Sequence, residues 1–264
     1  MHHIPRKRFG QNFLVDPQTV TDIIGAIQPK EDDLLVELGP GLGALTRPLL
    51  ESLEHLHVVE IDRDIVERLR HEFPQEKLTI HQGDALAFDF SMLGTNLRVV
   101  GNLPYNISTP LLFHLSRFAD AIRDMHFMLQ KEVVARMVAT PSTSDYGRLS
   151  VMLQCRFEME QLFLVLPECF RPAPKVESAV VRMVPLAHTM VEASEEALFA
   201  GIVSAAFSQR RKTLRNTLQN YLKPEDYPAL GIDPGLRAEN LSVTQFVAIA
   251  DYLGERVSQC GTSP

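Results

Sequence analysis

Apolar and polar positions follow two different rhythms through the first half of the chain. Short runs rich in Val, Ile and Leu have the length and composition of buried strands, at residues 34–38, 56–61, 78–81, 97–101 and 125–129. Between these runs, apolar residues recur every three or four positions, as on one face of a helix, at residues 44–53, 62–73, 110–118 and 131–139. Strands that alternate with helices predict a parallel sheet covered by helices on both faces.

The rhythm changes near residue 148. Three further apolar runs follow with little helical pattern between them, and we expect them to be antiparallel strands at the sheet edge: residues 148–157, 161–166 and 178–184. After Pro185 the pattern turns helical, at residues 195–208, 211–221 and 242–253. The sequence therefore predicts an α/β domain over residues 1–187 and a small, all-helical domain over residues 188–264.

Composition narrows the cellular setting. A hydrophobic fraction of 45% is typical of a globular protein, and no run approaches the roughly 20 apolar residues that cross a bilayer. The first residues, MHHIPRKRFGQNF, lack the apolar core of a signal peptide. The three cysteines show no CxxC spacing, which favours reduced thiols. We therefore predict a cytoplasmic protein that does not use a membrane.

The charge distribution gives two opposing indications about a nucleic-acid partner. A net charge of −7 argues against a nucleic-acid partner, because phosphate binding needs local cations. Residues 204–223, however, contain no acid and carry Arg210, Arg211, Lys212, Arg215 and Lys223. This segment is either a solvated face or a contact with RNA, and charge alone leaves both readings open.

Glycines alternate with other residues in ELGPGLG (37–43), directly after the first predicted strand. Gly39, Gly41 and Gly43 let the backbone turn tightly and approach a ligand without a Cβ in the way. The third glycine comes one residue too early for the GxGxxG spacing of dinucleotide-binding loops. An acid, Glu37, also precedes the first glycine by two residues. We interpret the loop as one that receives a nucleoside bearing an amino acid rather than a pyrophosphate.

Two more acids follow predicted strands. Glu60 ends the second strand, where a carboxylate can accept hydrogen bonds from both ribose hydroxyls of a nucleoside. Asp84 follows the third strand in the segment QGDA (82–85), where it can accept from an adenine amino group. A turn aspartate that caps the next segment is an equal alternative for Asp84 on its own.

The tetrapeptide NLPY (102–105) follows the fourth strand, at the edge where open α/β sheets bind ligands. The amide oxygen of Asn102 and the carbonyl of Leu103 can each accept one hydrogen of an exocyclic amine such as adenine N6, and so hold its nitrogen in line with a methyl donor. Pro104 fixes the turn, and Tyr105 offers a ring face for a base that has left its stack.

Together these motifs resemble those of the small-subunit ribosomal RNA adenine N6,N6-dimethyltransferases, the KsgA/RsmA family. The resemblance covers nearly the whole chain. It lies in RKRFGQNFL (6–14), VELGPGLGALT (36–46), VVEIDRD (58–64), QGDAL (82–86), GNLPYNISTPLLFHL (101–115), MHFMLQKEVVARM (125–137), YGRLSVMLQ (146–154), FRPAPKVESAVVRM (170–183) and AFSQRRKTLRN (206–216). The implied fold is the Rossmann-like sheet of class I methyltransferases, which use S-adenosylmethionine (SAM) and no metal, with a small C-terminal helical domain.

The resemblance also implies roles for individual positions. Those that would bind SAM are Asn12, Leu14, Gly39, Gly41, Gly43, Glu60, Asp84, Ala85 and Asn102. Asn102, Leu103, Pro104 and Tyr105 resemble the clamp for the target base, and Phe170 the aromatic that closes its other face. Arg210, Arg211, Lys212 and Arg215 lie where the family contacts ribosomal RNA. The implied substrate is two adjacent adenosines in the 3′-terminal hairpin of 16S rRNA, in a late assembly intermediate of the small subunit. The resemblance also implies a monomeric enzyme.

Three alternatives are distinguishable. A large-subunit (23S) rRNA adenine dimethyltransferase of the antibiotic-resistance type would share the clamp, but its loop resembles GxGKGxxT rather than GPGLGALT. A non-catalytic RNA-binding assembly factor would not need Glu60, Asp84 and Asn102 together. A nicotinamide oxidoreductase is disfavoured by the early third glycine and by NLPY.

Overall fold

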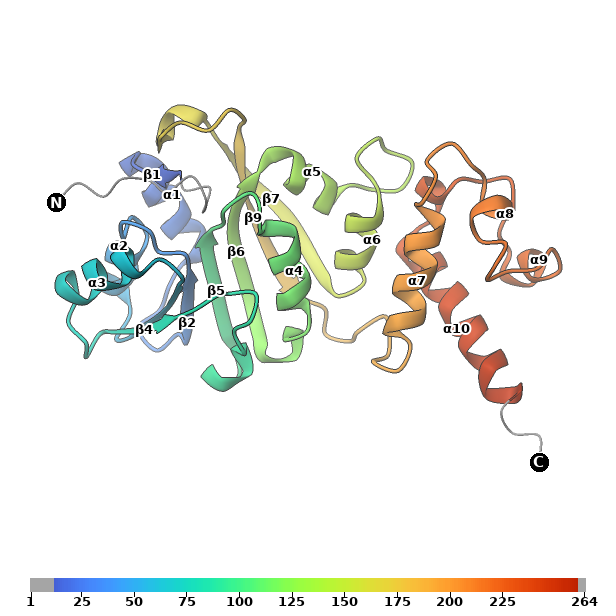
Figure 1. Cartoon of the computed structure of the whole chain (residues 1–264), viewed down its shortest axis with the longest axis horizontal. Helices are drawn as coiled ribbons and strands as arrows, with labels where there is room; N and C mark the ends of the chain where they lie inside the picture. The colour runs from blue at the N-terminus through green and yellow to red at the C-terminus, as the bar shows by residue number, and fades with distance from the viewer. Residues whose placement is uncertain (1–11, 261–264) are drawn as a thin grey trace. The chain divides into compact units, whose positions relative to one another are not determined.

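The computed structural model of this chain describes residues 12–260, with side chains through residue 256. Its residues form two compact units (Figure 1). One unit contains the residues up to 134 together with 159–185, and the other contains 135–158 together with the residues from 186 onward. This division differs from the predicted one at residue 187, because residues 135–158 pack with the C-terminal helices although the chain then returns to the sheet.

A seven-stranded sheet forms the centre of the first unit, in the order β4-β3-β2-β5-β6-β9-β7. The strands are β2 (Leu35–Leu38), β3 (Leu56–Glu60), β4 (Leu78–Gln82), β5 (Leu97–Asn102), β6 (Ile122–Gln130), β7 (Phe157–Val165) and β9 (Ser178–Pro185). The first five pair in parallel, and β9 pairs antiparallel with β6. The predicted α/β fold is thus confirmed.

The strand order reverses between β2 and β5. From β2 the chain moves outward through β3 to β4, whereas β5 lies on the other side of β2 and leads to β6. Right-handed crossovers therefore place helices α2 (Thr46–Ser52) and α3 (Arg63–Glu72) on one face and α4 (Ser108–Ser116) on the other. The reversal creates a crevice at the carboxyl ends of β2 and β5, which is where such sheets bind ligands.

The central strands are apolar because both of their faces are covered. Every residue of β2 is buried, and so are the first five of β5, with Leu35, Val99 and Val100 fully inaccessible to solvent. The sheet therefore fixes the positions of the loops that follow each strand.

The sequence pattern does not predict two elements near the N-terminus. Helix α1 (Pro17–Ile27) begins after Asp16, whose carboxylate accepts the Thr19 N–H, and has Pro17 in its first turn. Before it, strand β1 (Phe13–Leu14) pairs antiparallel with β8 (Phe170–Arg171). The peptide bond that follows β8, between Arg171 and Pro172, is cis. The β1–β8 pairing connects segments more than 150 residues apart.

The second unit is built mainly of helices. Helix α5 (Lys131–Val138) has residues in both units, and it is followed by α6 (Arg148–Gln154), α7 (Glu196–Ala206), α8 (Leu214–Thr217), α9 (Asp226–Leu230) and α10 (Val243–Cys260). Phe199, Ile202, Leu214, Phe246 and Ile249 lie in the apolar core of the second unit. The short helical turns η2 (Phe90–Leu93), η3 (Ala119–Ala121), η4 (Pro167–Cys169) and η5 (Ala238–Asn240) complete the elements of the described chain.

Two predictions of secondary structure are corrected here. The expected strand at residues 148–157 is mostly helix α6, which starts where Ser150 Oγ accepts the Gly147 N–H at 3.0 Å and buries Val151 and Leu153. A short apolar run does not distinguish a buried strand from a buried helix, and Leu, Met and Gln favour the helix. The expected helix at 211–221 shortens to α8, because Thr213 has an extended backbone.

Candidate active site

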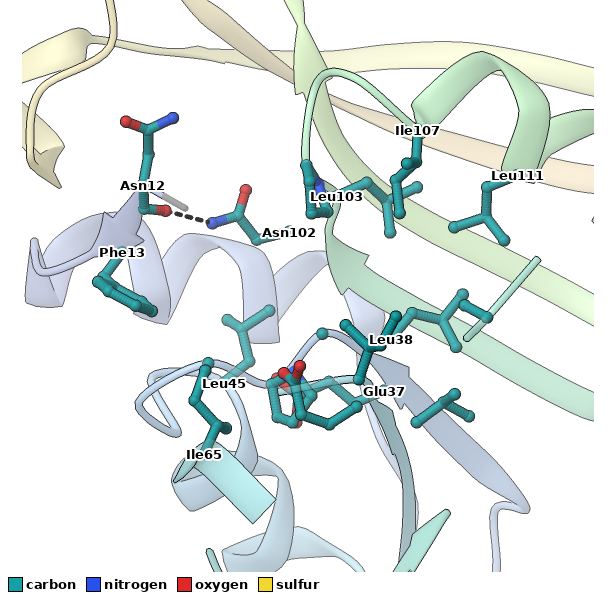
Figure 2. A pocket seen from close by; sticks show the side chains of 18 of the residues that line it. Asn12, Phe13, Glu37, Leu38, Leu45, Ile65, Asn102, Leu103, Ile107 and Leu111 are labelled. Atoms are coloured by element: carbon teal, nitrogen blue, oxygen red, sulfur yellow. Dashed lines mark hydrogen bonds between the residues drawn. The ribbon is translucent and has the colours of Figure 1, made fainter. Parts of the chain in front are cut away.

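A cavity opens at the carboxyl ends of β2 to β5, in the crevice that the strand reversal creates (Figure 2). Its walls are formed by β1, the glycine loop, the ends of β3 and β4, and the loop after β5. The predicted site residues among its lining are Asn12, Leu14, Gly39, Gly41, Glu60, Asp84, Ala85, Asn102, Leu103, Pro104 and Tyr105. Gly43 and Phe170, also predicted, do not line it.

The glycine loop has a backbone that other residues rarely adopt. Gly39, Gly41 and Gly43 have φ angles of +64°, +55° and +83°. A Cβ on Gly41 would also come within 3.1 Å of the Phe13 ring, which covers this part of the loop. Gly43 acts from outside the cavity, where its N–H donates to Pro40 O at 2.9 Å and closes the turn. The three glycines are therefore explained by the turn itself.

Glu60 lies at the end of β3 with its carboxylate on the cavity wall. Burial raises the pKa of this group, and the main-chain N–H groups of Asp62, Ile61 and Gly41, which donate to it, oppose that rise. The Asp62 N–H lies 2.8 Å from Oε1. A carboxylate has about four acceptor positions, so Glu60 is oriented by the backbone and keeps capacity for a ligand.

Asp84 makes the turn contact that the sequence offered as one alternative, and it also lies on the cavity wall. Its Oδ1 accepts the Leu86 N–H at 2.9 Å, as in a turn aspartate, while the residue also lines the cavity. The turn therefore orients the carboxylate instead of competing with ligand binding. Ala85 follows on the same wall.

Glu37 is a second buried acid beside Glu60. Its Oε2 accepts the Thr46 hydroxyl at 2.6 Å, and the residue is only 2% exposed. Burial raises the pKa of Glu37 to about 8, the Thr46 hydrogen bond opposes this, and the charge of Glu60 adds to it. At pH 7 the Glu37 side chain is therefore a neutral acid.

Asn102 is held from the opposite wall. Its amide nitrogen donates to the main-chain oxygen of Asn12 at 3.1 Å, the contact drawn in Figure 2. Because the nitrogen is committed to Asn12, the amide oxygen is the atom left to accept a hydrogen bond, and within the described chain it has no partner. The QNFL and NLPY segments, both predicted to belong to the site, are thus in direct contact.

The rest of the NLPY segment is anchored at both ends. The Leu103 N–H donates to Met128 O at 3.2 Å, and Pro104 O accepts the Ile107 N–H at 3.1 Å. The Leu103 side chain is buried, and its carbonyl receives no hydrogen bond from residues 12–260. Tyr105 is half-buried on the same wall, and its hydroxyl is hydrogen-bonded to Ser178 Oγ. Two carbonyl oxygens and one ring are thereby presented by a fixed loop.

Phe170 lies outside this arrangement. The residue is 1% exposed and belongs to the apolar core, where its backbone pairs with Leu14. In this structure the ring packs as a core aromatic, and its closing of the far face of a base stays a prediction.

Sequence reasoning missed several of the cavity residues, among them Ile61 and Phe13. Ile61 lines the cavity with an aliphatic side chain that is 47% exposed, next to Glu60. An exposed aliphatic side chain beside an acid that is expected to bind ribose can pack on the base of a nucleoside, and its position directly after Glu60 was the available signal. Phe13 also lines the cavity, and its neighbours in the QNFL segment were the available signal.

The four predicted RNA contacts lie in the second unit. Arg210, Arg211, Lys212 and Arg215 are all exposed, at the turn between α7 and α8 and in α8 itself. Arg210 donates to Ser144 O at 3.2 Å, and residues 207–217 contain no acid. The four residues thus form a local cationic surface on an acidic chain.

The described chain lacks two further kinds of feature. No helix between residues 12 and 260 combines the length and the apolar character that crossing a membrane requires. In the same range, no three His, Cys, Asp or Glu side chains converge with a geometry suited to a metal ion.

Comparison with known proteins decides the family. The profile described as ribosomal RNA adenine dimethylase matches residues 2–255. This chain belongs to the ribosomal RNA adenine dimethylase family. It is accordingly an rRNA adenine methyltransferase, as the motifs predicted, and the resemblance to this family is confirmed.

Relatives within the dimethylase family are very similar to this chain. A protein of Nitrosospira multiformis named ribosomal RNA small subunit methyltransferase A is 77% identical over 252 residues, which are 96% of this chain and 97% of that protein. A protein of the same name from Thiobacillus denitrificans is 66% identical over 254 residues, covering 96% of this chain and 100% of that protein.

Solved structures support the same fold. The crystal structure of a dimethyladenosine transferase from Plasmodium falciparum has a TM-score of 0.77 at 24% identity, covering 93% of this chain and 98% of that one. The structure of the 23S rRNA methyltransferase ErmE has a TM-score of 0.72 at 25% identity, covering 92% of this chain and 100% of that one. The dimethylase fold therefore accounts for both units.

Proposed function

We propose that this enzyme transfers methyl groups from SAM to the N6 atoms of two adjacent adenosines in the 3′-terminal hairpin of 16S rRNA, twice on each, in a late assembly intermediate of the small subunit. The single observation that carries the chemistry is the Asn102–Asn12 hydrogen bond of 3.1 Å, because it commits the amide nitrogen and leaves the oxygen as acceptor.

The donor and acceptor groups of the cavity fit SAM. Glu60 offers an oriented carboxylate to the ribose hydroxyls, and Asp84 offers one to an adenine amino group. Gly39 and Gly41 let the loop backbone approach, and Ile61 offers an apolar face to the base. When bound, SAM supplies an electrophilic methyl group on a positively charged sulfur.

The protein then contributes position and electrostatics. Asn102 Oδ1 and Leu103 O each accept one hydrogen of N6, which directs the nitrogen lone pair toward the methyl donor and favours its pyramidal form. Tyr105 stacks on the adenine, which must leave its own stack to enter. As the bond between N6 and the methyl carbon forms, the carbon–sulfur bond of SAM breaks and S-adenosylhomocysteine leaves. The surplus proton on N6 then passes to water, so no side chain needs to act as a strong base on N6 before transfer.

The small-subunit target is favoured over the large-subunit alternative by identity. The relatives at 66% and 77% identity carry the name small subunit methyltransferase A, whereas the 23S methyltransferase ErmE is 25% identical. We further propose that residues 1–187 bind SAM, that residues 188–264 contact RNA through Arg210, Arg211, Lys212 and Arg215, and that the enzyme is a cytoplasmic monomer.

The test compares possible RNA targets directly. Small subunits from cells lacking this protein, and naked 23S RNA, are each incubated with the enzyme and isotopically labelled SAM. Mass spectrometry should find N6,N6-dimethyladenosine at two neighbouring positions of the 3′-terminal hairpin of 16S rRNA. Label confined to 23S RNA would support the large-subunit reading, and binding of subunits without any label would support a non-catalytic assembly factor.

A further inference from the structure

The last residue of the segment FRPAPKVES (170–178) is hydrogen-bonded to the NLPY loop. Ser178 Oγ lies 2.7 Å from the hydroxyl oxygen of Tyr105, and either hydroxyl can donate. We infer that Ser178 is a positioning residue that holds the long axis of the Tyr105 ring in the place where the ring stacks on the target adenine. This inference rests on the proposed function.

Ser178 is a rigid point of attachment. It is the first residue of β9 and is fully buried, and its backbone is in register with Gln130 of β6 in the antiparallel ladder. Just before it, Lys131 N donates to Glu177 O at 3.0 Å. The sheet therefore fixes the main chain that carries the Ser178 hydroxyl.

Tyr105, by contrast, lies in a loop. It comes three residues after the end of β5 and three before the start of α4. Its side chain is anchored at the Cβ end by that loop and at the hydroxyl end by Ser178, which is the only partner of this hydroxyl within the described chain. Holding both ends of the ring fixes its long axis at the cavity wall.

A fixed ring position is what stacking in a reactive geometry requires. A base that stacks on a ring free to tilt would place N6 in a range of positions, whereas transfer needs alignment with Asn102 Oδ1 and Leu103 O. Burial also raises the pKa of Tyr105, with the Ser178 hydrogen bond opposing that rise. The hydroxyl thus stays protonated and able to hydrogen-bond throughout the neutral pH range.

The loop provides a matched control. Ser108 is also buried and also contacts Tyr105, but its Oγ donates to the main-chain oxygen of Tyr105 at 3.1 Å. Ser178 and Ser108 therefore differ in whether they hold the ring or the backbone. Only removal of the Ser178 hydroxyl should be coupled to removal of the Tyr105 hydroxyl.

The test is a double-mutant cycle on methylation of small subunits, with SAM affinity and melting temperature measured for every variant. Ser178→Ala and Tyr105→Phe should each lower kcat by about 3- to 10-fold, the effect of removing one hydrogen bond. Their SAM Kd values should stay within about 2-fold of wild type, and the double variant should lose no more than either single one. Ser108→Ala with Tyr105→Phe should show multiplied losses.

Several outcomes would overturn the inference. These are multiplied losses for Ser178→Ala with Tyr105→Phe, unchanged kcat in both, or losses that follow melting temperature alone. If Ser178→Ala does not fold, two other measurements decide instead. One is the effect of Tyr105→Phe on kcat. The other compares the ring resonances of the five tyrosines between wild type and a Ser178→Cys variant. Failure of the proposed function is distinct, because then the wild-type enzyme itself would transfer no methyl group to small subunits.

Discussion

Arg98 and Asp124 are joined by two hydrogen bonds inside the sheet, with Nε to Oδ1 at 2.9 Å and Nη2 to Oδ2 at 3.0 Å. The Arg98 guanidinium also reaches Asp33 at 2.6 Å and the main-chain oxygens of Ile27 and Gln28 at the end of α1. This network lies at the opposite end of β5 from Asn102. It joins α1 to two central strands without touching the cavity.

Removing Arg98 should therefore destabilise the protein without changing its chemistry. Arg98→Ala leaves the buried carboxylate of Asp124 without its arginine partner, and we expect the free energy of unfolding to fall by about 3–5 kcal/mol. Arg123→Ala is the control, because Arg123 pairs with the same Asp33 from a side chain that is 41% exposed and should cost at most about 1 kcal/mol. Urea denaturation measures both, and equal losses would contradict the role assigned to burial.

Asn102 should carry most of the catalytic effect. Asn102→Ala removes the amide oxygen that accepts from N6, and we expect the methylation rate to fall roughly 100-fold, as when one fixed polar group is removed from other active sites. Gln18→Ala, which removes an exposed amide on α1, is the control and should leave the rate unchanged. Single-turnover kinetics with labelled SAM would measure this, and an unchanged rate for Asn102→Ala would exclude the proposed grip on N6.

Glu60 should contribute to the binding of SAM. Glu60→Gln replaces a carboxylate that accepts from ribose hydroxyls, so we expect SAM affinity to fall roughly 10- to 100-fold, the range for hydrogen bonds to a charged group. Glu67→Gln on the exposed face of α3 removes the same charge and should have little effect. Calorimetry with SAM measures both dissociation constants. A similar Kd for the two variants would remove Glu60 from the ribose site.

Glu37 predicts a pH dependence of stability. Its pKa is about 8 in the folded protein and has an ordinary value of 4.5. Between these values the native state keeps a proton that the unfolded chain has lost, so this group lowers the free energy of unfolding as pH rises, by at most about 1.4 kcal/mol per pH unit. Above the folded pKa its contribution becomes constant.

The variant Glu37→Gln isolates that contribution. Glutamine stays neutral in both states and can still accept from Thr46, so the variant should lose less stability than wild type between pH 5 and pH 8. Urea denaturation at four pH values across this range would show the difference. Parallel curves for the two proteins would mean that Glu37 is ionised in the fold.

The cationic surface of the second unit should govern the salt dependence of binding. Replacing Arg210, Arg211 and Lys212 by Gln should weaken small-subunit binding and flatten its dependence on salt, by up to about 0.9 in slope for each phosphate that the surface no longer neutralises. Replacing the exposed Lys30, Arg70 and Lys77 changes the net charge equally and is the control. Filter binding at several salt concentrations measures the slopes. Equal effects of the two triple variants would make the surface a solvated face.

Local sequence patterns are sufficient to predict much of this structure. The strand that ends in Glu37 and Leu38, the glycines with positive φ, and the loop from Asn102 to Tyr105 all follow from short-range sequence chemistry. The family resemblance adds Asn12 and Leu14, and both line the cavity.

Local pattern does not provide the contacts between distant segments. Nothing near Asn102 indicates that Asn12 O receives its amide, since the two residues are 90 positions apart, and Ser178 is 73 positions from Tyr105. The helix at 148–154 escapes prediction because its apolar run fits either element, and packing against α7 and α10 decides between them. Tertiary partners also determine the burial of Phe170.

The pairing of β1 with β8 has a consequence for synthesis. Phe13 and Leu14, beside the Asn12 that holds Asn102, find their strand partners only in Arg171 and Phe170. The hydroxyl that holds Tyr105 comes later still, from Ser178. A nascent chain consequently cannot complete its catalytic pocket while residue 178 is inside the exit tunnel, so the pocket is completed only after more than two thirds of the chain has been translated.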